Sequence, residues 1–89
     1  MSMWHLYMLK CADGTFYTGV AKDLSRRIKE HNRGTSRASK YTRSRLPAEL
    51  VYSERCDGRS AALKREIEVK RLSRQAKIRL AASAGPGMP

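Results

Sequence analysis

The stretch "HLYMLKCADGTFYTGV", residues 5–20, consists of two short runs of apolar and aromatic residues on either side of Ala-Asp-Gly. Runs of this length and composition are typical of β-strands, and Asp-Gly between them is a strong signal for a hairpin turn. The sequence therefore predicts two antiparallel strands, near residues 5–11 and 15–20.

The length of the turn decides where the two tyrosines of this hairpin lie. A two-residue turn at 13–14 would place Tyr7 and Tyr17 on opposite faces of the sheet. A three-residue turn over 12–14 would pair Tyr7 with Gly19 and put both tyrosines on one face. The sequence leaves both turns open, and a site shared by the two phenols requires the second.

The chain after the hairpin predicts a helix and a third strand. In "KDLSRRIKEHNRG", Leu24 and Ile28 are four residues apart, Asp23 is a suitable N-cap and Gly34 a suitable end. A third strand is expected around Leu-Val-Tyr at residues 50–52.

Two further helices are expected, with serines at their N-caps. Ser60 precedes a helical apolar pattern, and Ser73 precedes another. The predicted fold is α+β, with a small three-stranded antiparallel sheet flanked by helices. We expect one domain over residues 1–82 and a flexible tail over 83–89.

The charge of the chain is strongly positive. Its 89 residues hold 19 Lys and Arg against 8 Asp and Glu, a net charge of +11. This balance favours a polyanionic partner, with nucleic acid first and an anionic membrane surface second. The sequence has no apolar run long enough to span a membrane and no recognisable export signal, so we expect a cytoplasmic protein with no membrane partner. Cys11 and Cys56 are then expected as free thiols.

The first predicted helix divides its cations between two sides. Arg27 and His31 are four residues apart and lie beside the apolar stripe, whereas Arg26 and Lys29 point away from it. A guanidinium at a buried edge needs an anion. An internal salt bridge and an anionic ligand both satisfy this requirement, and the spacing does not separate them.

The second predicted helix divides its carboxylates in the same way. Glu66 lies inside the apolar arc, and Glu68 lies among surface cations. An inward carboxylate could hold a divalent ion, bond the Arg27 guanidinium or pair with Lys70. All three interpretations stay open on the sequence alone.

Taken in order, "LYM", "YTG", "DLSRRIKEHN", "SKYTRSRLPAELVYSE" and "SAALKREIEVKRL" resemble the GIY-YIG nuclease superfamily. The chain is most similar to the small stand-alone single-domain branch and to the nuclease domain of the Slx-type structure-specific endonucleases. The resemblance spans roughly residues 4–80. It implies the three-stranded fold expected above and a metal-dependent hydrolysis of phosphodiester bonds.

The resemblance also implies a role for each matching residue. Tyr17 would activate or position the attacking water, and Tyr7 would orient groups around the scissile phosphate. Arg27 would stabilise the charge that develops on the phosphate, because arginine stays protonated. Glu66 would be the metal ligand for Mg²⁺ or Mn²⁺, and His31 would bond a phosphate or assist Tyr17.

The chain departs from the family pattern at several positions, including Leu6 and Met8 in the first motif and Thr18 in the second. Val20 stands where DNA-repair relatives have a lysine after the glycine of the second motif, and Lys22 is the nearest substitute. Several relatives also carry an asparagine downstream of the metal-binding glutamate, whereas the single asparagine here, Asn32, precedes Glu66.

Further cations surround these motifs. Basic side chains interleaved with hydroxyls and an aromatic ring can contact phosphates and stack on a base. The residues predicted to bind nucleic acid are Lys22, Arg26, Arg37, Lys40, Tyr41, Arg43 and Arg45.

The sequence therefore favours a divalent-metal-dependent DNA endonuclease that acts on branched, nicked or single-stranded DNA in repair or recombination. A domain of the same fold that binds nucleic acid without cutting it is the alternative. A third interpretation is an interaction module, and a protein partner that supplies targeting is a further expectation.

Overall fold

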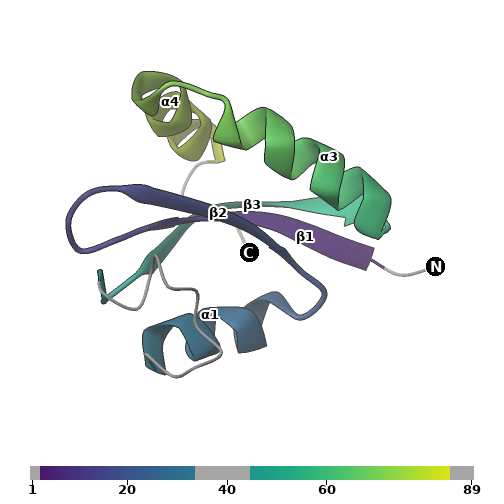
Figure 1. Ribbon diagram of the computed structural model, residues 1–89, viewed down its shortest axis with the longest axis horizontal. Coiled ribbons are helices and arrows are strands. Elements are labelled where there is room, and N and C mark those ends of the chain that lie inside the picture. Colours follow the sequence, from purple (N-terminus) through teal and green to yellow (C-terminus); the bar gives the residue numbers. More distant parts are fainter. Residues whose placement is uncertain (1–2, 34–44, 85–89) are drawn as a thin grey trace.

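The computed structural model describes residues 3–33 and 45–84 (Figure 1). A three-stranded antiparallel sheet lies at its centre, and helices cover both faces. The strands are β1 (Met3–Lys10), β2 (Phe16–Ala21) and β3 (Glu49–Asp57), in the order β2-β1-β3. Helix α1 (Leu24–Arg33) lies on one face, and α3 (Arg59–Lys70) and α4 (Arg74–Ala84) lie on the other. The predicted α+β fold is confirmed.

The hairpin uses the three-residue turn. The Cys11 N–H donates to the Thr15 carbonyl over 2.8 Å, and the Gly14 N–H donates to the Cys11 carbonyl over 2.9 Å. Gly14 has φ of 84°, a conformation that glycine adopts without steric strain. The resulting register pairs Tyr7 with Gly19, so Tyr7 and Tyr17 share a face of the sheet.

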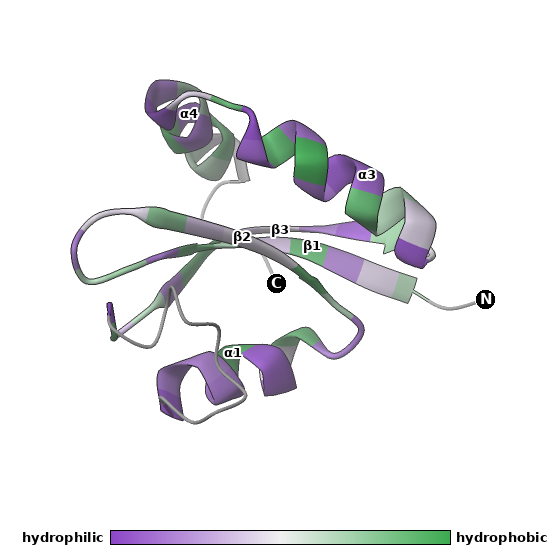
Figure 2. Cartoon of the chain, in the orientation of Figure 1, coloured by the Kyte–Doolittle hydropathy of each residue, from purple (hydrophilic) through white to green (hydrophobic). Residues whose placement is uncertain are grey.

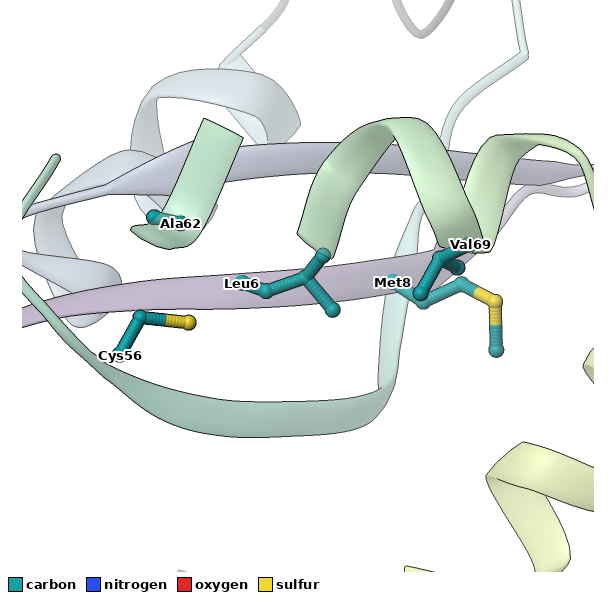
Figure 3. Close-up of a cluster of buried hydrophobic side chains, with 5 residues drawn as sticks. All are labelled: Leu6, Met8, Cys56, Ala62 and Val69. Carbon is teal, nitrogen blue, oxygen red and sulfur yellow. The ribbon is translucent and has the colours of Figure 1, made fainter. Parts of the chain in front are cut away.

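The alternation of side chains along β1 divides the core into two parts. Even-numbered Leu6 and Met8 face α3, and odd-numbered Tyr7 and Leu9 face α1. Figure 3 shows the first cluster, which consists of Leu6, Met8, Cys56, Ala62 and Val69. The α1 side is different in character, because α1 is hydrophilic along most of its length (Figure 2). Leu24 and Ile28 of α1 pack against the sheet there, together with His31, which is fully buried.

Two of the three expected helix caps are present. Asp23 Oδ1 accepts a hydrogen bond from the Arg26 N–H at the start of α1, over 3.1 Å. Ser73 Oγ accepts one from the Ala76 N–H, also over 3.1 Å, and α4 begins at the next residue. These side chains satisfy backbone donors that the first turn leaves unpaired.

The expected cap at Ser60 is wrong. Helix α3 begins at Arg59 after Gly58, whose φ of 95° lets the chain turn sharply out of β3, and no side chain caps it. Helix α3 packs on the sheet through Ala62 and Val69, and Ile67 is 52% exposed.

The third strand is longer than the apolar run predicted. It extends over Glu49–Asp57 and pairs with β1 nearly along its whole length. Cys11 and Cys56 are free and buried. Helix α4 ends at Ala84, two residues beyond the expected domain boundary. None of the helices within residues 3–33 and 45–84 is long and apolar enough to cross a membrane.

The segment before β3 is fastened at two points. Asn32 at the end of α1 accepts a hydrogen bond from the Ala48 N–H over 2.9 Å and donates one to the Ala48 carbonyl over 3.0 Å. Arg45 pairs with Asp13 of the hairpin turn over 2.9 Å. Asn32, the single asparagine of the chain, thus has a structural role.

We expect Asn32→Ala to lower the free energy of unfolding by about 1–2 kcal/mol, because both backbone groups of Ala48 lose their partner. Asn32→Asp keeps an acceptor for the Ala48 N–H and should lose less. Urea unfolding followed by circular dichroism measures both changes. Lys29→Ala, an exposed position on the same helix, is the control. Equal stability of Asn32→Ala and Lys29→Ala would show that the hydrogen bonds between Asn32 and the Ala48 backbone contribute nothing to stability.

Candidate active site

The site is built around the close approach of Tyr7 to Gly19. A Cβ atom on Gly19 would lie 2.6 Å from the Tyr7 hydroxyl oxygen and 2.8 Å from the ring carbon that carries it. Residue 19 must therefore be glycine for the phenol to lie flat against β2. The sequence prediction did not count Gly19 as a site residue, although a glycine inside a strand is a recognised sign of close approach.

The Tyr7 phenol reaches the imidazole of His31 on α1. Its oxygen lies 2.8 Å from His31 Nε2, and the two residues are 1% and 0% exposed. The Tyr17 ring is half-buried beside them, with its centroid 5.1 Å from that of His31 and 6.3 Å from that of Tyr7. Two strands and a helix thus bring three rings together.

Burial keeps the Tyr7–His31 pair uncharged. Removal from water and, to a smaller extent, the nearby Arg27 charge together lower the pKa of His31 to about 4, against the opposing effect of Glu30. Burial also raises the pKa of Tyr7, as does Tyr17, while Arg27 acts in the opposite direction. At neutral pH the phenol is therefore protonated and the imidazole is neutral.

Arg27 places a permanent positive charge next to this pair. Its side chain is 27% exposed and forms an ion pair with Glu30 over 3.2 Å. Arg26, on the outer side of the helix, is 68% exposed and lies 3.5 Å from the same carboxylate. The helical spacing had separated these two arginines in this way. Arg27 thus has the internal salt bridge considered above and is still partly open to solvent.

Glu66 lies away from this cluster, on the helix that covers the other face of the sheet. Its side chain is 19% exposed and pairs with Lys70 over 3.5 Å. Of the five predicted catalytic residues, the structure brings four together: Tyr7, Tyr17, Arg27 and His31. It does not bring Glu66 to them.

The position of Glu66 around α3 indicates which edge of the sheet it approaches. Ala62 and Val69 mark the side that faces the sheet, and Arg65 and Glu66 lie on either side of that line. Arg65 pairs with Glu54 of β3 over 2.9 Å. Since β3 forms one edge of the sheet, Glu66 lies toward the other edge, which is the strand that carries Tyr17.

The carboxylates determine which metal site the chain can offer. Within residues 3–33 and 45–84, no group of three or more His, Cys, Asp or Glu side chains is arranged to hold a metal ion. A single half-buried carboxylate suits a hydrated Mg²⁺, which keeps several waters and takes further ligands from phosphates. The donor chemistry of Glu66 fits that kind of site and does not fit a closed cage.

The predicted nucleic-acid contacts fall into three groups. Lys22 and Arg26 are exposed on the α1 side of the sheet. Arg45 is occupied by its ion pair with Asp13, which connects two loops. The others, Arg37, Lys40, Tyr41 and Arg43, lie outside the described residues.

Comparison with known proteins agrees with this geometry. A family model described as the GIY-YIG catalytic domain matches residues 3–79. A UPF0213 protein of Staphylococcus saprophyticus is 50% identical over 80 residues, which cover 90% of this chain and 95% of the relative. The UPF0213 protein of Staphylococcus aureus strain Mu3 is 49% identical with the same coverage.

Two solution structures share the fold. The UPF0213 protein BH0048 from Bacillus halodurans is 40% identical, with a TM-score of 0.60, over 97% of this chain and 90% of that one. The protein EF2693 from E. faecalis is 35% identical, with a TM-score of 0.61, over 93% of this chain and 86% of that one.

The hairpin register, the buried rings and the match over most of the chain define a GIY-YIG catalytic domain, and the chain belongs to this nuclease family. Identity of about half its residues over nearly the full length places it among the small UPF0213 proteins. The names of these relatives state no activity or substrate.

We expect Gly19→Ala to displace the Tyr7 phenol and open the site to water. The nearest contacts lie well below van der Waals distance, so overpacking should cost about 1–3 kcal/mol of stability. NMR titration of the His31 ring should show its pKa rising from about 4 toward the usual value of 6.5. Gly58→Ala is the control, because it strains a turn with no atom within 4 Å of the added carbon. An unchanged His31 titration in Gly19→Ala would contradict the packing described here.

The low pKa of His31 predicts a pH-dependent stability. Between pH 6.5 and pH 4 the unfolded chain binds a proton on this ring and the folded chain does not, so stability falls as the pH falls through that range. From pH 7 to pH 4.5 the wild type should lose about 2–3 kcal/mol more than His31→Gln. Urea unfolding at the two pH values measures the difference, and parallel losses in the two proteins would refute the assignment.

Proposed function

We propose that this protein hydrolyses phosphodiester bonds in DNA with the help of a divalent metal ion. The observation that carries the proposal is the buried Tyr7–His31 hydrogen bond, which lies against Gly19 and next to the Arg27 guanidinium. This arrangement fixes two phenols and a permanent cation on one face of the sheet. The net charge of +11 favours an anionic polymer as the substrate.

Arg27 has the properties needed to stabilise a phosphate in the transition state. Hydrolysis adds negative charge to a group that is already anionic, and a guanidinium keeps its proton throughout. The partial exposure of Arg27 lets a phosphate reach it, and the ion pair with Glu30 holds its side chain in place. A phosphate oxygen would exchange part of that ion pair for a stronger contact in a drier site.

The two tyrosines have different surroundings, which favours different roles. Tyr7 is buried with a raised pKa, so it acts as a fixed hydroxyl that positions its neighbours, and it does not take a proton from water. Tyr17 is half-buried on edge strand β2, where it can contact an incoming water and a substrate strand. Neutral His31 fixes the orientation of the first phenol and packs against the second.

Glu66 would hold Mg²⁺ or Mn²⁺ at the β2 edge. Such an ion would supply a Lewis acid for a phosphate oxygen and lower the pKa of a bound water. Glu66 would have to leave Lys70, and their 3.5 Å contact is a surface ion pair of low strength. A DNA strand that crosses the β2 edge would meet Tyr17 on one face and approach Glu66 on the other.

Branched, nicked and single-stranded DNA are the proposed substrates. Within residues 3–33 and 45–84, the face of the sheet near Arg27 is covered by one helix of ten residues, which gives little surface for enclosing a duplex, whereas an edge strand suits a flexible chain. Lys22 and Arg26 are exposed on that side and would contact flanking phosphates.

Binding without cleavage is a second candidate function, and the separation of Glu66 from the ring cluster favours it. The carboxylate is already paired with Lys70, and Val20 replaces the lysine found in DNA-repair relatives. A chain that kept the Tyr7–His31 pair and its positive charge could hold DNA without a metal.

Two matched pairs of variants separate the candidates. Arg27→Ala should lower the cleavage rate with Mg²⁺ by about a hundredfold or more, because it removes charge stabilisation in the transition state. Glu66→Gln should abolish cleavage that depends on Mg²⁺, because it removes the proposed metal ligand. Arg26→Ala and Glu68→Gln change the same helices at exposed positions; Arg26→Ala should weaken DNA binding, and both should alter the rate at saturating DNA less than about threefold. Cleavage of labelled duplex, flap, junction and single-stranded substrates is the measurement.

Equal losses within each pair would contradict the proposed roles of Arg27 and Glu66. Binding to DNA with no cleavage of any substrate, in either Mg²⁺ or Mn²⁺, would establish the binding function instead.

A further inference from the structure

A hollow of about 620 Å³ lies beside the first turns of α1, on the same face of the sheet as the Tyr7–His31 pair. Leu24, Ile28 and Leu50 form its aliphatic wall. Its volume is in the range of pockets that bind small organic ligands. It could not be predicted from the sequence, because its lining comes from β1, β3, α1 and the β2–α1 connection.

The hollow borders the catalytic cluster. Ser53, which lines it, lies directly opposite Tyr7 in the β1–β3 pairing. His5, on another part of the wall, is two residues before Tyr7 on the same face of β1, a distance of about 7 Å along a strand. Ile28 follows Arg27 in α1. A ligand in the hollow would therefore be within one nucleotide of a phosphate at Arg27.

His5, which lines the hollow, carries a polar atom whose missing partner indicates a ligand. Its Nδ1 atom is buried and has no hydrogen-bond partner among the described residues. A buried nitrogen without a partner is unfavourable, and it is uncommon in folded proteins. The edge of a nucleobase carries donors and acceptors in one plane, so it can satisfy this atom, whichever tautomer the imidazole adopts, once the ring turns toward the hollow.

Two cations complete the surroundings. Lys22 and Arg55 are exposed residues that line the hollow. Of the two acids there, Glu54 is paired with Arg65 and Asp23 caps α1. The hollow thus offers aliphatic walls for a flat ring, one buried polar atom and positive charge for phosphates.

We propose that this hollow binds one unpaired nucleobase of the DNA strand whose phosphate lies at Arg27, an inference that rests on the proposed function. A base that is stacked and paired inside a duplex cannot enter it unless it is first flipped out. The substrate is therefore a single strand, or a branched or nicked DNA that presents an unpaired nucleotide next to the cleaved bond.

The test measures binding of the full chain without metal. A short labelled single strand is compared, by fluorescence anisotropy, with versions in which one abasic residue is moved along the sequence. One position should lose about tenfold in affinity, because it no longer supplies the base, and the others should change little. The same sequence as a blunt duplex should bind at least tenfold more weakly than the single strand.

Variants of the protein test whether the loss of affinity at the abasic position arises in the hollow. Ser25→Trp adds a large ring to an exposed residue of α1 that lines the hollow, and it should reproduce the tenfold loss and abolish the response to the abasic residue. Ser60→Trp makes the same change at an exposed position on α3 and should bind like the wild type. His5→Phe keeps the shape of the wall and removes Nδ1, so it should weaken binding of the intact strand more than that of the abasic strand.

An abasic scan without a sensitive position, or equal binding by Ser25→Trp and Ser60→Trp, would overturn the nucleobase site. Because no metal is present, the outcome is independent of cleavage. If the scan shows one sensitive position and no substrate is cut, the nucleobase site stands and the hydrolysis proposal fails. If substrates are cut and the scan is flat, the reverse holds.

Discussion

The structure depends on a steric constraint between two neighbouring strands: the Tyr7 phenol needs the space that a side chain at Gly19 would fill. The constraint requires the three-residue turn, because a register shifted by one residue would turn Tyr17 to the other face. Once the phenol lies there, its hydroxyl reaches His31 and orients α1, which in turn places Arg27. The absence of a Cβ atom at residue 19, the three-residue turn and the position of α1 therefore depend on one another.

Local spacing was enough to predict what lies on a single element or on one hairpin. The division between Arg27 and Arg26 follows from helical periodicity, and the alternative positions of Tyr17 follow from two possible turns. What the sequence could not supply depends on contacts between distant segments. The start of α3 is set by the backbone at Gly58, where the apolar pattern pointed to Ser60. The ion pair of Arg45 with Asp13, 32 residues away in the chain, is another such contact.

Glu66 illustrates a different limit. Its inward position in α3 was correctly read from the helical pattern, since its side chain is only 19% exposed. The pattern could not reveal that α1 and α3 cover opposite faces, because that depends on how the two connections leave the sheet. The roles that the family resemblance implies for Arg27 and Glu66 would be met most simply if both side chains lined one pocket. The structure instead puts the carboxylate toward the edge of β2, so any joint action with Arg27 has to take place around an edge strand.

The alternation along β1 also has a consequence for how this chain could change during evolution. Side chains that point to α3 form an apolar layer, and those that point to α1 include the Tyr7 phenol of the candidate site, so consecutive positions of one strand are under separate selective pressures. Leu6 and Met8 can drift among aliphatic residues of similar size, while Tyr7 between them cannot. A lineage could in this way become more thermostable through substitutions in the apolar layer and leave the candidate site unaltered.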